Sequence, residues 1–243
     1  MDNYKLLISY DGTNYCGWQN QPQAKTIQGE IESALKKIFQ DKLIYLVGSG
    51  RTDSGVHALN QTANFNIKTN MTEFQIKNAL NSNLNSSIFI ISCNEVSINF
   101  HSRFSAIKRE YLYNISKIYS PFNKKFEWFI KYDLDLDKLA ACSKLIIGKH
   151  DFSRFCKTSS RKENNICDIF VSKWTMNHEK VFYNIVSDRF LHHMVRLLVG
   201  TMIEVAVGRI SLSEFEKLVQ NKSCSINPVK SPAKGLFLNK VFY

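Results

Sequence analysis

The chain has 243 residues, 44% of them hydrophobic, which is enough to bury a sizeable core as one large domain or two closely packed ones. Its formal net charge of +11 favours an anionic partner such as nucleic acid or an acidic membrane surface, although a lysine-rich surface kept for solubility gives the same balance. The charge is uneven: residues 1–105 carry 9 Lys/Arg against 8 Asp/Glu, whereas residues 106–243 carry 23 against 13.

The cysteines and the N-terminus indicate the compartment. None of the six cysteines stands in a CxxC pair, and their scattered spacing suggests neither a zinc site nor a disulfide framework, so we expect free thiols. The opening MDNYKLLISYDG lacks the features of a signal peptide, and no apolar run approaches the ~20 residues that span a bilayer. We therefore expect a soluble, cytoplasmic protein that does not enter a membrane.

The first half of the chain predicts alternating strands and helices. Short runs of β-branched and aromatic residues predict strands at residues 4–10, 43–47, 62–67 and 88–93. Two helices are expected, one capped by Thr26 and one opened by a capping box of Thr72 and Gln75.

The second half repeats this mixture. Strands are predicted at residues 111–116 and 126–132, twice within 166–186, and at the C-terminus; helices are predicted at 135–147, from about 190 to 206, and after Ser211. The least structured stretches are polar and mostly basic, as loops along an RNA surface would be: 117–126, 157–165 and 222–234. The pattern predicts the α+β class, with two similar halves, residues 1–105 and 106–243, and mixed, largely antiparallel sheets flanked by helices.

The segment GSGRTDSGVHA at residues 48–58 carries the clearest chemical signal. Its three glycines permit unusual dihedrals and close approach to a ligand, and it holds Arg51, Asp53 and His57. A phosphate cradle is disfavoured because no Gly-Lys-Ser/Thr ending follows, while a structural turn stays open. A strand that leads into a Gly-flanked aspartate beside an arginine suits a reactive carboxylate, which the cation would keep ionised.

Three residues on a later predicted helix also attract attention. Arg196 lies on an otherwise apolar helix, and a buried arginine needs a partner. His192 and His193 could suggest a metal, but adjacent helical residues point about 100° apart and no third ligand is in register. We therefore expect no metal there, and interpret the histidines as packing or RNA-facing.

On these residues the chain resembles the tRNA pseudouridine synthase A family. GRTDSGVHA at 50–58 is similar to that family's signature. Four further segments resemble its other motifs in the same order: YDGTNYCGWQ at 10–19, FHSRFSAIKREYLY at 100–113, FLHHMVRLLVGTMIEVAVG at 190–208 and AKGLFL at 233–238. The loop 157–165 departs from the family by being short.

The resemblance implies a pseudouridine synthase fold with a central basic cleft. The first half would carry the catalytic motif, and the second would complete the active site and the RNA-binding surface. It implies isomerisation of uridine to pseudouridine at positions 38, 39 and 40 of the tRNA anticodon stem-loop, by a homodimer that needs no cofactor and no metal.

The resemblance also implies residue roles. Asp53 would be the essential carboxylate, paired with Arg196, and Tyr111 would stack on the flipped base and donate its hydroxyl, although strand periodicity alone makes Tyr111 an ordinary aromatic. From its place beside Asp53, Arg51 could merely brace the loop, but we favour a role in holding the RNA strand once the base is flipped. Arg103 would be a phosphate contact or part of the base-flipping apparatus. The expected RNA contacts are Phe100, His101, Ser102, Arg103, Phe104, Lys157 and Arg161.

Two other functions are weighed against this one. A non-catalytic RNA-binding protein would also use a basic half and exposed aromatics, but it gains nothing from a carboxylate that repels phosphate. A metal-dependent hydrolase would need clustered His, Cys or Asp ligands, and the sequence suggests none.

Overall fold

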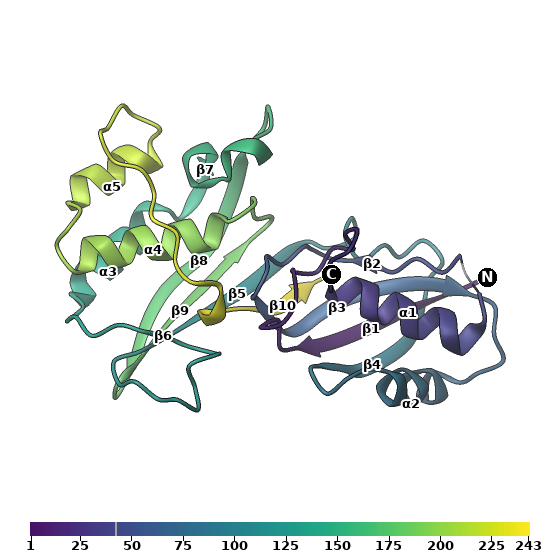
Figure 1. Ribbon diagram of the computed structural model, residues 1–243. Helices are drawn as coiled ribbons and strands as arrows, with labels where there is room; N and C mark the ends of the chain where they lie inside the picture. Colours follow the sequence, from purple (N-terminus) through teal and green to yellow (C-terminus); the bar gives the residue numbers. More distant parts are fainter. Residues whose placement is uncertain (42) are drawn as a thin grey trace. The chain divides into compact units, whose positions relative to one another are not determined.

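The computed structural model describes residues 1–41 and 43–243, and these form two units (Figure 1). Unit 1 comprises Met1–Ile107 together with Phe237–Tyr243, and unit 2 comprises Lys108–Leu236. Each unit combines a mixed or antiparallel sheet with helices, so the predicted α+β class is confirmed. None of the described helices is long and apolar enough to cross a membrane.

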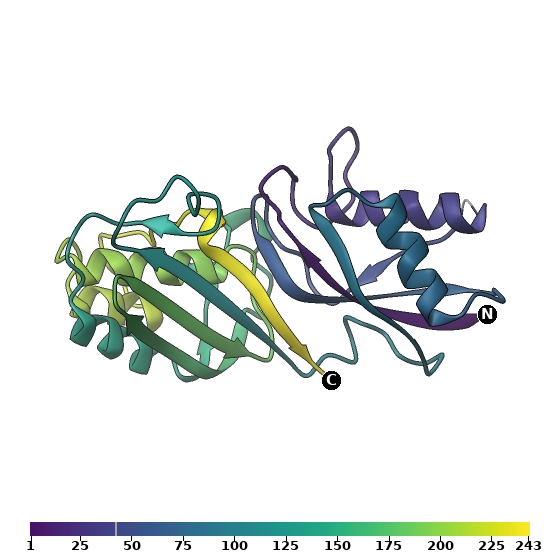
Figure 2. The same ribbon diagram turned by 90° about the horizontal axis from the view of Figure 1, so that it is seen from below.

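Unit 1 is a sheet with the strand order β4-β1-β3-β10, in which β1 is antiparallel to both of its neighbours and β10 is parallel to β3. Both of its helices lie on one face of this sheet (Figure 2). A further short strand, β2, pairs with β3. The bounds are β1 Asp2–Tyr10, α1 Ile27–Phe39, β2 Val47–Gly48, β3 His57–Ile67, α2 Glu73–Asn83, β4 Ile88–Val96 and β10 Leu236–Phe242.

Unit 2 is built on the order β5-β9-β8-β7, with every pair antiparallel and β6 added in parallel on β5. Helix α4 is buried along most of its length, as expected of a helix that is apolar on nearly all sides. The bounds are β5 Lys108–Ser116, β6 Trp128–Phe129, α3 Leu136–Leu145, β7 Gly148–Asp151, β8 Ile166–Asn177, β9 Lys180–Ser187, α4 Met194–Ala206 and α5 Leu212–Val219.

The C-terminal strand differs from the expected division into halves. The sequence assigned residues 237–243 to the second half, whereas they belong to unit 1. Phe237 pairs with His57 in the β3–β10 ladder, and the side-chain amide of Asn60 donates to the carbonyl of Asn239. Strand partners far apart in sequence therefore override proximity along the chain.

Two predicted strands are shorter than expected, and one was missed. Of residues 43–47 only Val47 joins a strand, because the N–H of Leu46 bonds to the carboxylate of Glu32 instead of to a neighbouring strand. Of residues 126–132 only β6 pairs, and β7, directly after α3, had no distinctive alternation to predict it.

The start of α4 also needs correction. The helix begins at Met194 and not near residue 190, because His193 takes the left-handed conformation with φ of 68°. His192 and His193 are therefore not helical, and the argument from helical geometry against a metal does not apply to them. That no metal is needed stays a prediction.

Glu32 on α1 is a buried acidic residue that the sequence gave no reason to single out. Its carboxylate accepts from the N–H of Leu46 at 3.1 Å, from Gln28 Nε2 at 3.0 Å and from Asn20 Nδ2 at 3.3 Å. It therefore fastens two loops to one helix.

We predict that Glu32→Ala lowers the free energy of unfolding by about 2–3 kcal/mol, because it leaves a buried backbone N–H without its charged acceptor. Urea denaturation measures this change. Ser33→Ala, at an exposed position of the same helix, is the control and should stay within about 0.5 kcal/mol of wild type. Equal effects of the two substitutions would contradict the role given to Glu32.

Candidate active site

Asp53 lies on the loop between β2 and β3, in unit 1. Thr52 is buried, Asp53 is half-buried and Arg51 is exposed, so the loop presents its carboxylate and guanidinium groups from an anchored backbone. A tight turn follows, in which the N–H of Val56 donates to the carbonyl of Asp53 at 3.2 Å. Gly55 takes a φ of 75° there, a left-handed conformation that glycine adopts readily.

A second loop, residues 11–18, holds the Asp53 loop in place. The N–H of Trp18 donates to the carbonyl of Thr52 at 3.1 Å, and the carbonyl of Tyr15 accepts from the N–H of Gly55 at 3.3 Å and from Ser54 Oγ at 3.1 Å. The hydroxyl groups of Tyr10 and Thr52 are 2.8 Å apart. The backbone on either side of Asp53 is thus hydrogen-bonded to the same partner loop.

Glycines make this close approach possible. A Cβ on Gly17, whose φ is 90°, would lie 2.6 Å from the carbonyl oxygen of Thr52 and 3.1 Å from the carbonyl carbon of Asp53. A Cβ on Gly12 would lie 2.0 Å from the carbonyl oxygen of Val56. These contacts give a steric reason for both glycines of the YDGTNYCGWQ segment.

The other end of the loop is held by Gln61, a fully buried polar residue of β3. Its Oε1 accepts from Ser49 Oγ at 2.6 Å, and its Nε2 donates to the carbonyl of Gly50 at 3.1 Å. Sequence analysis did not identify Gln61, Tyr15 or Trp18 as supports of the loop. The available signal was a polar residue at a buried position of a strand.

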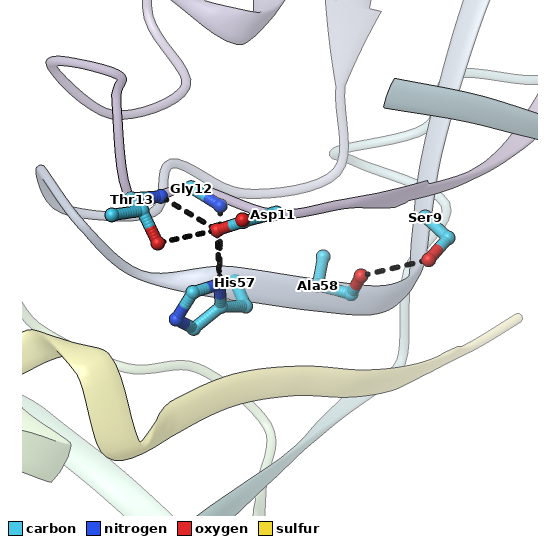
Figure 3. Close-up of polar contacts among 6 residues, drawn as sticks. All are labelled: Ser9, Asp11, Gly12, Thr13, His57 and Ala58. Atoms are coloured by element: carbon cyan, nitrogen blue, oxygen red, sulfur yellow. Dashed lines mark hydrogen bonds and ion pairs between the residues drawn. The ribbon is translucent and has the colours of Figure 1, made fainter. Parts of the chain in front are cut away.

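His57, at the start of β3, closes the loop on its C-terminal side (Figure 3). Its Nδ1 lies 3.1 Å from the N–H nitrogen of Gly12 and 3.2 Å from Oδ1 of Asp11. The imidazole stacks on Phe237, with ring centroids 4.7 Å apart. The side chain is thereby fixed in both position and orientation.

The FHSRF segment, residues 100–104, lies at the opposite end of β3 from Asp53. The N–H of Ser102 donates to Asn64 Oδ1 at 2.8 Å, and Asn64 stands seven residues beyond His57. At about 3.3 Å per residue, the segment is roughly 20 Å from the start of β3. Unit 1 therefore does not bring Arg103 next to Asp53.

Within that segment the side chains take different positions. Phe104 is 75% exposed, and the guanidinium of Arg103 lies 5.5 Å from its ring centroid. His101 packs against Phe104 at 4.3 Å. Ser102 is buried, and Phe100 packs against Tyr243. An exposed ring beside a guanidinium suits contact with an RNA base and its phosphate.

Tyr111 and Tyr113 lie on the same face of β5 in unit 2, and both are buried. Tyr111 meets Phe190 edge to face, with ring centroids 5.1 Å apart. The hydroxyl of Tyr113 donates to the carbonyl of Pro232 at 2.7 Å, and burial raises the pKa of this phenol above its usual value. Tyr113 thus has a structural role in unit 2.

The other three basic residues predicted for the site, Lys157, Arg161 and Arg196, belong to unit 2. Arg196 Nε donates to the carbonyl of Ser231 at 2.9 Å, which ties the helix to the segment before the AKGLFL motif. Lys157 and Arg161 are exposed, and their loop is fastened to His192 by the N–H of Lys157 and by Ser160 Oγ. The pairing of Arg196 with Asp53 stays a prediction.

Four of the six thiols are buried, which makes them poorly suited to a catalytic role. All six cysteines belong to the described part of the chain and are free, as expected. Burial raises the pKa of Cys93, Cys142 and Cys167 to about 12, so these thiols stay protonated at neutral pH and are poor nucleophiles. A carboxylate on an anchored loop is better suited to act as a nucleophile or as a base.

Comparison with known sequences decides the family. Residues 6–105 and 141–243 match the family described as tRNA pseudouridine synthase. The tRNA pseudouridine synthase A 2 of Clostridium tetani is 36% identical over 99% of this chain and 98% of its own length. The tRNA pseudouridine synthase A of Caldicellulosiruptor saccharolyticus is 38% identical over the full length of both chains.

The chain belongs to the tRNA pseudouridine synthase family. The family predicted from five sequence motifs is therefore confirmed, and with it the prediction of an isomerase. Both loops described above, residues 11–18 and 48–57, lie in the matched part, whereas Tyr111 lies in the unmatched stretch 106–140. A chain of the archaeal box H/ACA sRNP Nop10-Cbf5 complex covers 83% of this synthase and 43% of its own length, at 11% identity and a TM-score of 0.37, which is too low to support a comparison.

We predict that Gly17→Ala slows single-turnover pseudouridine formation by about 100-fold, because the new Cβ must push the backbone beside Asp53 by more than a few tenths of an ångström. Gly148→Ala is the matched control, since Gly148 has a φ of 92° but no atom within 4 Å of the added Cβ. Both variants should lose about 1–2 kcal/mol of stability from the left-handed conformation, Gly17→Ala should lose more because its Cβ also clashes with backbone, and only Gly17→Ala should lose the rate. Similar rates for the two would show that the loop contact is not needed.

Proposed function

We propose that this synthase isomerises uridine to pseudouridine at positions 38, 39 and 40 of the tRNA anticodon stem-loop, with Asp53 as its essential carboxylate. The observation that carries the proposal is the Asp53 loop of this family member, which is hydrogen-bonded on both sides and presents a half-buried carboxylate. The finer assignment to three positions comes from the family resemblance.

The isomerisation requires a carboxylate in a fixed position, and the Asp53 loop supplies one. The uracil must leave its sugar, rotate and rejoin through carbon 5, so no atom is gained or lost. The target base must first leave its stack, at a cost of a few kcal/mol. A fixed carboxylate can then attack carbon 1′, add to the ring or remove the 2′ proton. Each route needs the carboxylate held to within about an ångström.

The exposed basic residues supply the RNA-binding surface in this proposal. Arg103 contacts a phosphate away from the flipped base, since about 20 Å along β3 exceeds the reach of an arginine side chain. Phe104 offers a stacking face beside it, and Lys157 and Arg161 supply cations from unit 2. Arg51, next to Asp53 but exposed, holds the strand on either side of the flipped nucleotide.

The proposal also includes a cytoplasmic homodimer. A tRNA is large compared with one protomer of 243 residues, and a symmetric pair would let one subunit grip the tRNA while the other modifies it. Six free thiols are in keeping with a reducing compartment. Sedimentation at micromolar concentration should give the mass of two protomers, and the mass of one would contradict this part of the proposal.

Asp53→Asn should abolish pseudouridine formation, because the amide has nearly the shape of the carboxylate but neither its nucleophilicity nor its basicity. Asp53→Glu should lose about 100-fold or more, because one methylene moves the charge by about 1 Å. Both variants should bind tRNA at least as well as wild type, since a negative charge near phosphates is removed or shifted. Single-turnover kinetics at saturating enzyme, with filter binding on the same samples, measure both properties.

Substantial product from Asp53→Asn would refute the catalytic assignment. The chain would then be better described as a non-catalytic RNA-binding protein, the second candidate, which the basic second half would equally serve. Tight tRNA binding together with a complete loss of product would support the synthase.

Substitutions at Tyr111 separate its ring from its hydroxyl. We expect Tyr111→Phe to slow the reaction while tRNA affinity stays close to wild type, because the ring that would stack on the base is retained. Tyr111→Ala should in addition weaken binding by roughly 1–3 kcal/mol. Tyr113→Phe is the control from the same strand face, and should cost about 1 kcal/mol of stability with an unchanged rate on bound RNA. Wild-type behaviour of both Tyr111 variants would make that residue structural.

A further inference from the structure

His57 is a chemically versatile residue of the catalytic motif to which the proposed reaction gives no role. It is only 1% exposed, and it stands four residues after Asp53. Its Nδ1 has two neighbours, the N–H of Gly12 at 3.1 Å and Oδ1 of Asp11 at 3.2 Å (Figure 3). A single nitrogen cannot serve both, because it accepts a hydrogen bond only when unprotonated and donates one only when protonated.

The surroundings favour the unprotonated nitrogen. Gly12 is buried, and a buried N–H left without an acceptor costs about 1–3 kcal/mol. Oδ1 of Asp11, by contrast, already accepts from the N–H of Thr13 at 2.9 Å and from its hydroxyl at 2.5 Å. A neutral imidazole with its proton on Nε2 satisfies Gly12 and leaves Oδ1 of Asp11 bonded to the N–H and the hydroxyl of Thr13.

This hydrogen bond connects directly to the loop that carries Asp53. The backbone of Gly12 lies against that of Val56, so closely that a Cβ would be 2.0 Å from the Val56 carbonyl oxygen. Gly12 also belongs to the loop of residues 11–18, which is hydrogen-bonded to Thr52, Ser54 and Gly55. On its other side, His57 is braced by the ring of Phe237. The imidazole thus joins the partner loop, β3 and β10 at one point.

We propose that His57 is a positioning residue for Asp53: its neutral imidazole accepts the Gly12 N–H and so fixes the C-terminal side of the catalytic loop. The proposal rests on the function proposed above for Asp53. His57 touches no reacting atom in it. Without His57 the Asp53 carboxylate is still present, but the loop that carries it can shift relative to the target base.

The test compares two substitutions at this position. In His57→Asn the side-chain oxygen takes about the position of Nδ1 and can still accept from Gly12, whereas His57→Leu keeps an apolar side chain against Phe237 without any acceptor. We expect His57→Leu to lower the single-turnover rate by about 100-fold with a tRNA Kd within about twofold of wild type. His57→Asn should recover at least about tenfold of that loss. His150→Leu, on β7, is the control and should leave the rate within about twofold.

A merely structural role would give a different pattern, since both variants would then lose folded protein and rate in proportion, without rescue by asparagine. A folded His57→Leu variant with the wild-type rate, or no recovery in His57→Asn, overturns the proposal. These outcomes differ from failure of the function itself, which would appear as product from Asp53→Asn.

A second measurement needs no substitution. Nitrogen-15 NMR of the wild-type protein labelled at histidine reports which ring nitrogen carries the proton. We expect His57 to be neutral at pH 7, with the proton on Nε2 and a bare Nδ1. A proton on Nδ1 would mean that the side chain is bonded to Asp11 instead, and the proposal would be wrong even if every His57 variant failed to fold.

Discussion

The backbone contact between the loop of residues 11–18 and the loop that carries Asp53 is the constraint on which the rest of the site depends. Neither loop has regular secondary structure, so each depends on the other for its hydrogen bonds. The contact is close enough that Gly12 and Gly17 have no room for a side chain. The carboxylate of Asp53, for which we propose the catalytic role, is thereby held without any strand or helix of its own.

Buried polar side chains of β3 anchor the loops around this contact. Polar groups in a core cost free energy unless they are hydrogen-bonded. The buried polar side chains beside the Asp53 loop are hydrogen-bonded. Gln61 binds one side of it, His57 the other, and Asn64 reaches the FHSRF segment at the far end of the same strand. Side chains of strand β3 therefore anchor loops at several places along its length, and a fixed backbone is what the catalysis proposed for Asp53 requires.

Local signals in the sequence predicted local structure well. The helix starts at Thr26, Thr72 and Ser211 are all confirmed, because an N-cap depends on residues within one turn of the helix. Strand lengths were predicted less well, since a strand exists only where a partner lies beside it. Leu46 shows the difference, because a buried glutamate takes the hydrogen bond that a strand would have used. The left-handed His193, which delays the start of α4, has no signal in its residue type.

The sequence by itself determined the α+β class, the family, the uneven basic charge and the choice of Asp53 as the candidate carboxylate, because these depend on residue types and on motifs that are contiguous along the chain. Only the tertiary structure decided that Phe237–Tyr243 belongs to unit 1, that the FHSRF segment lies roughly 20 Å along β3 from the Asp53 loop, and that His57 meets both Gly12 and Asp11. These are contacts between residues from about 40 to nearly 200 positions apart, and their geometry follows from strand pairing and packing, which no local pattern encodes.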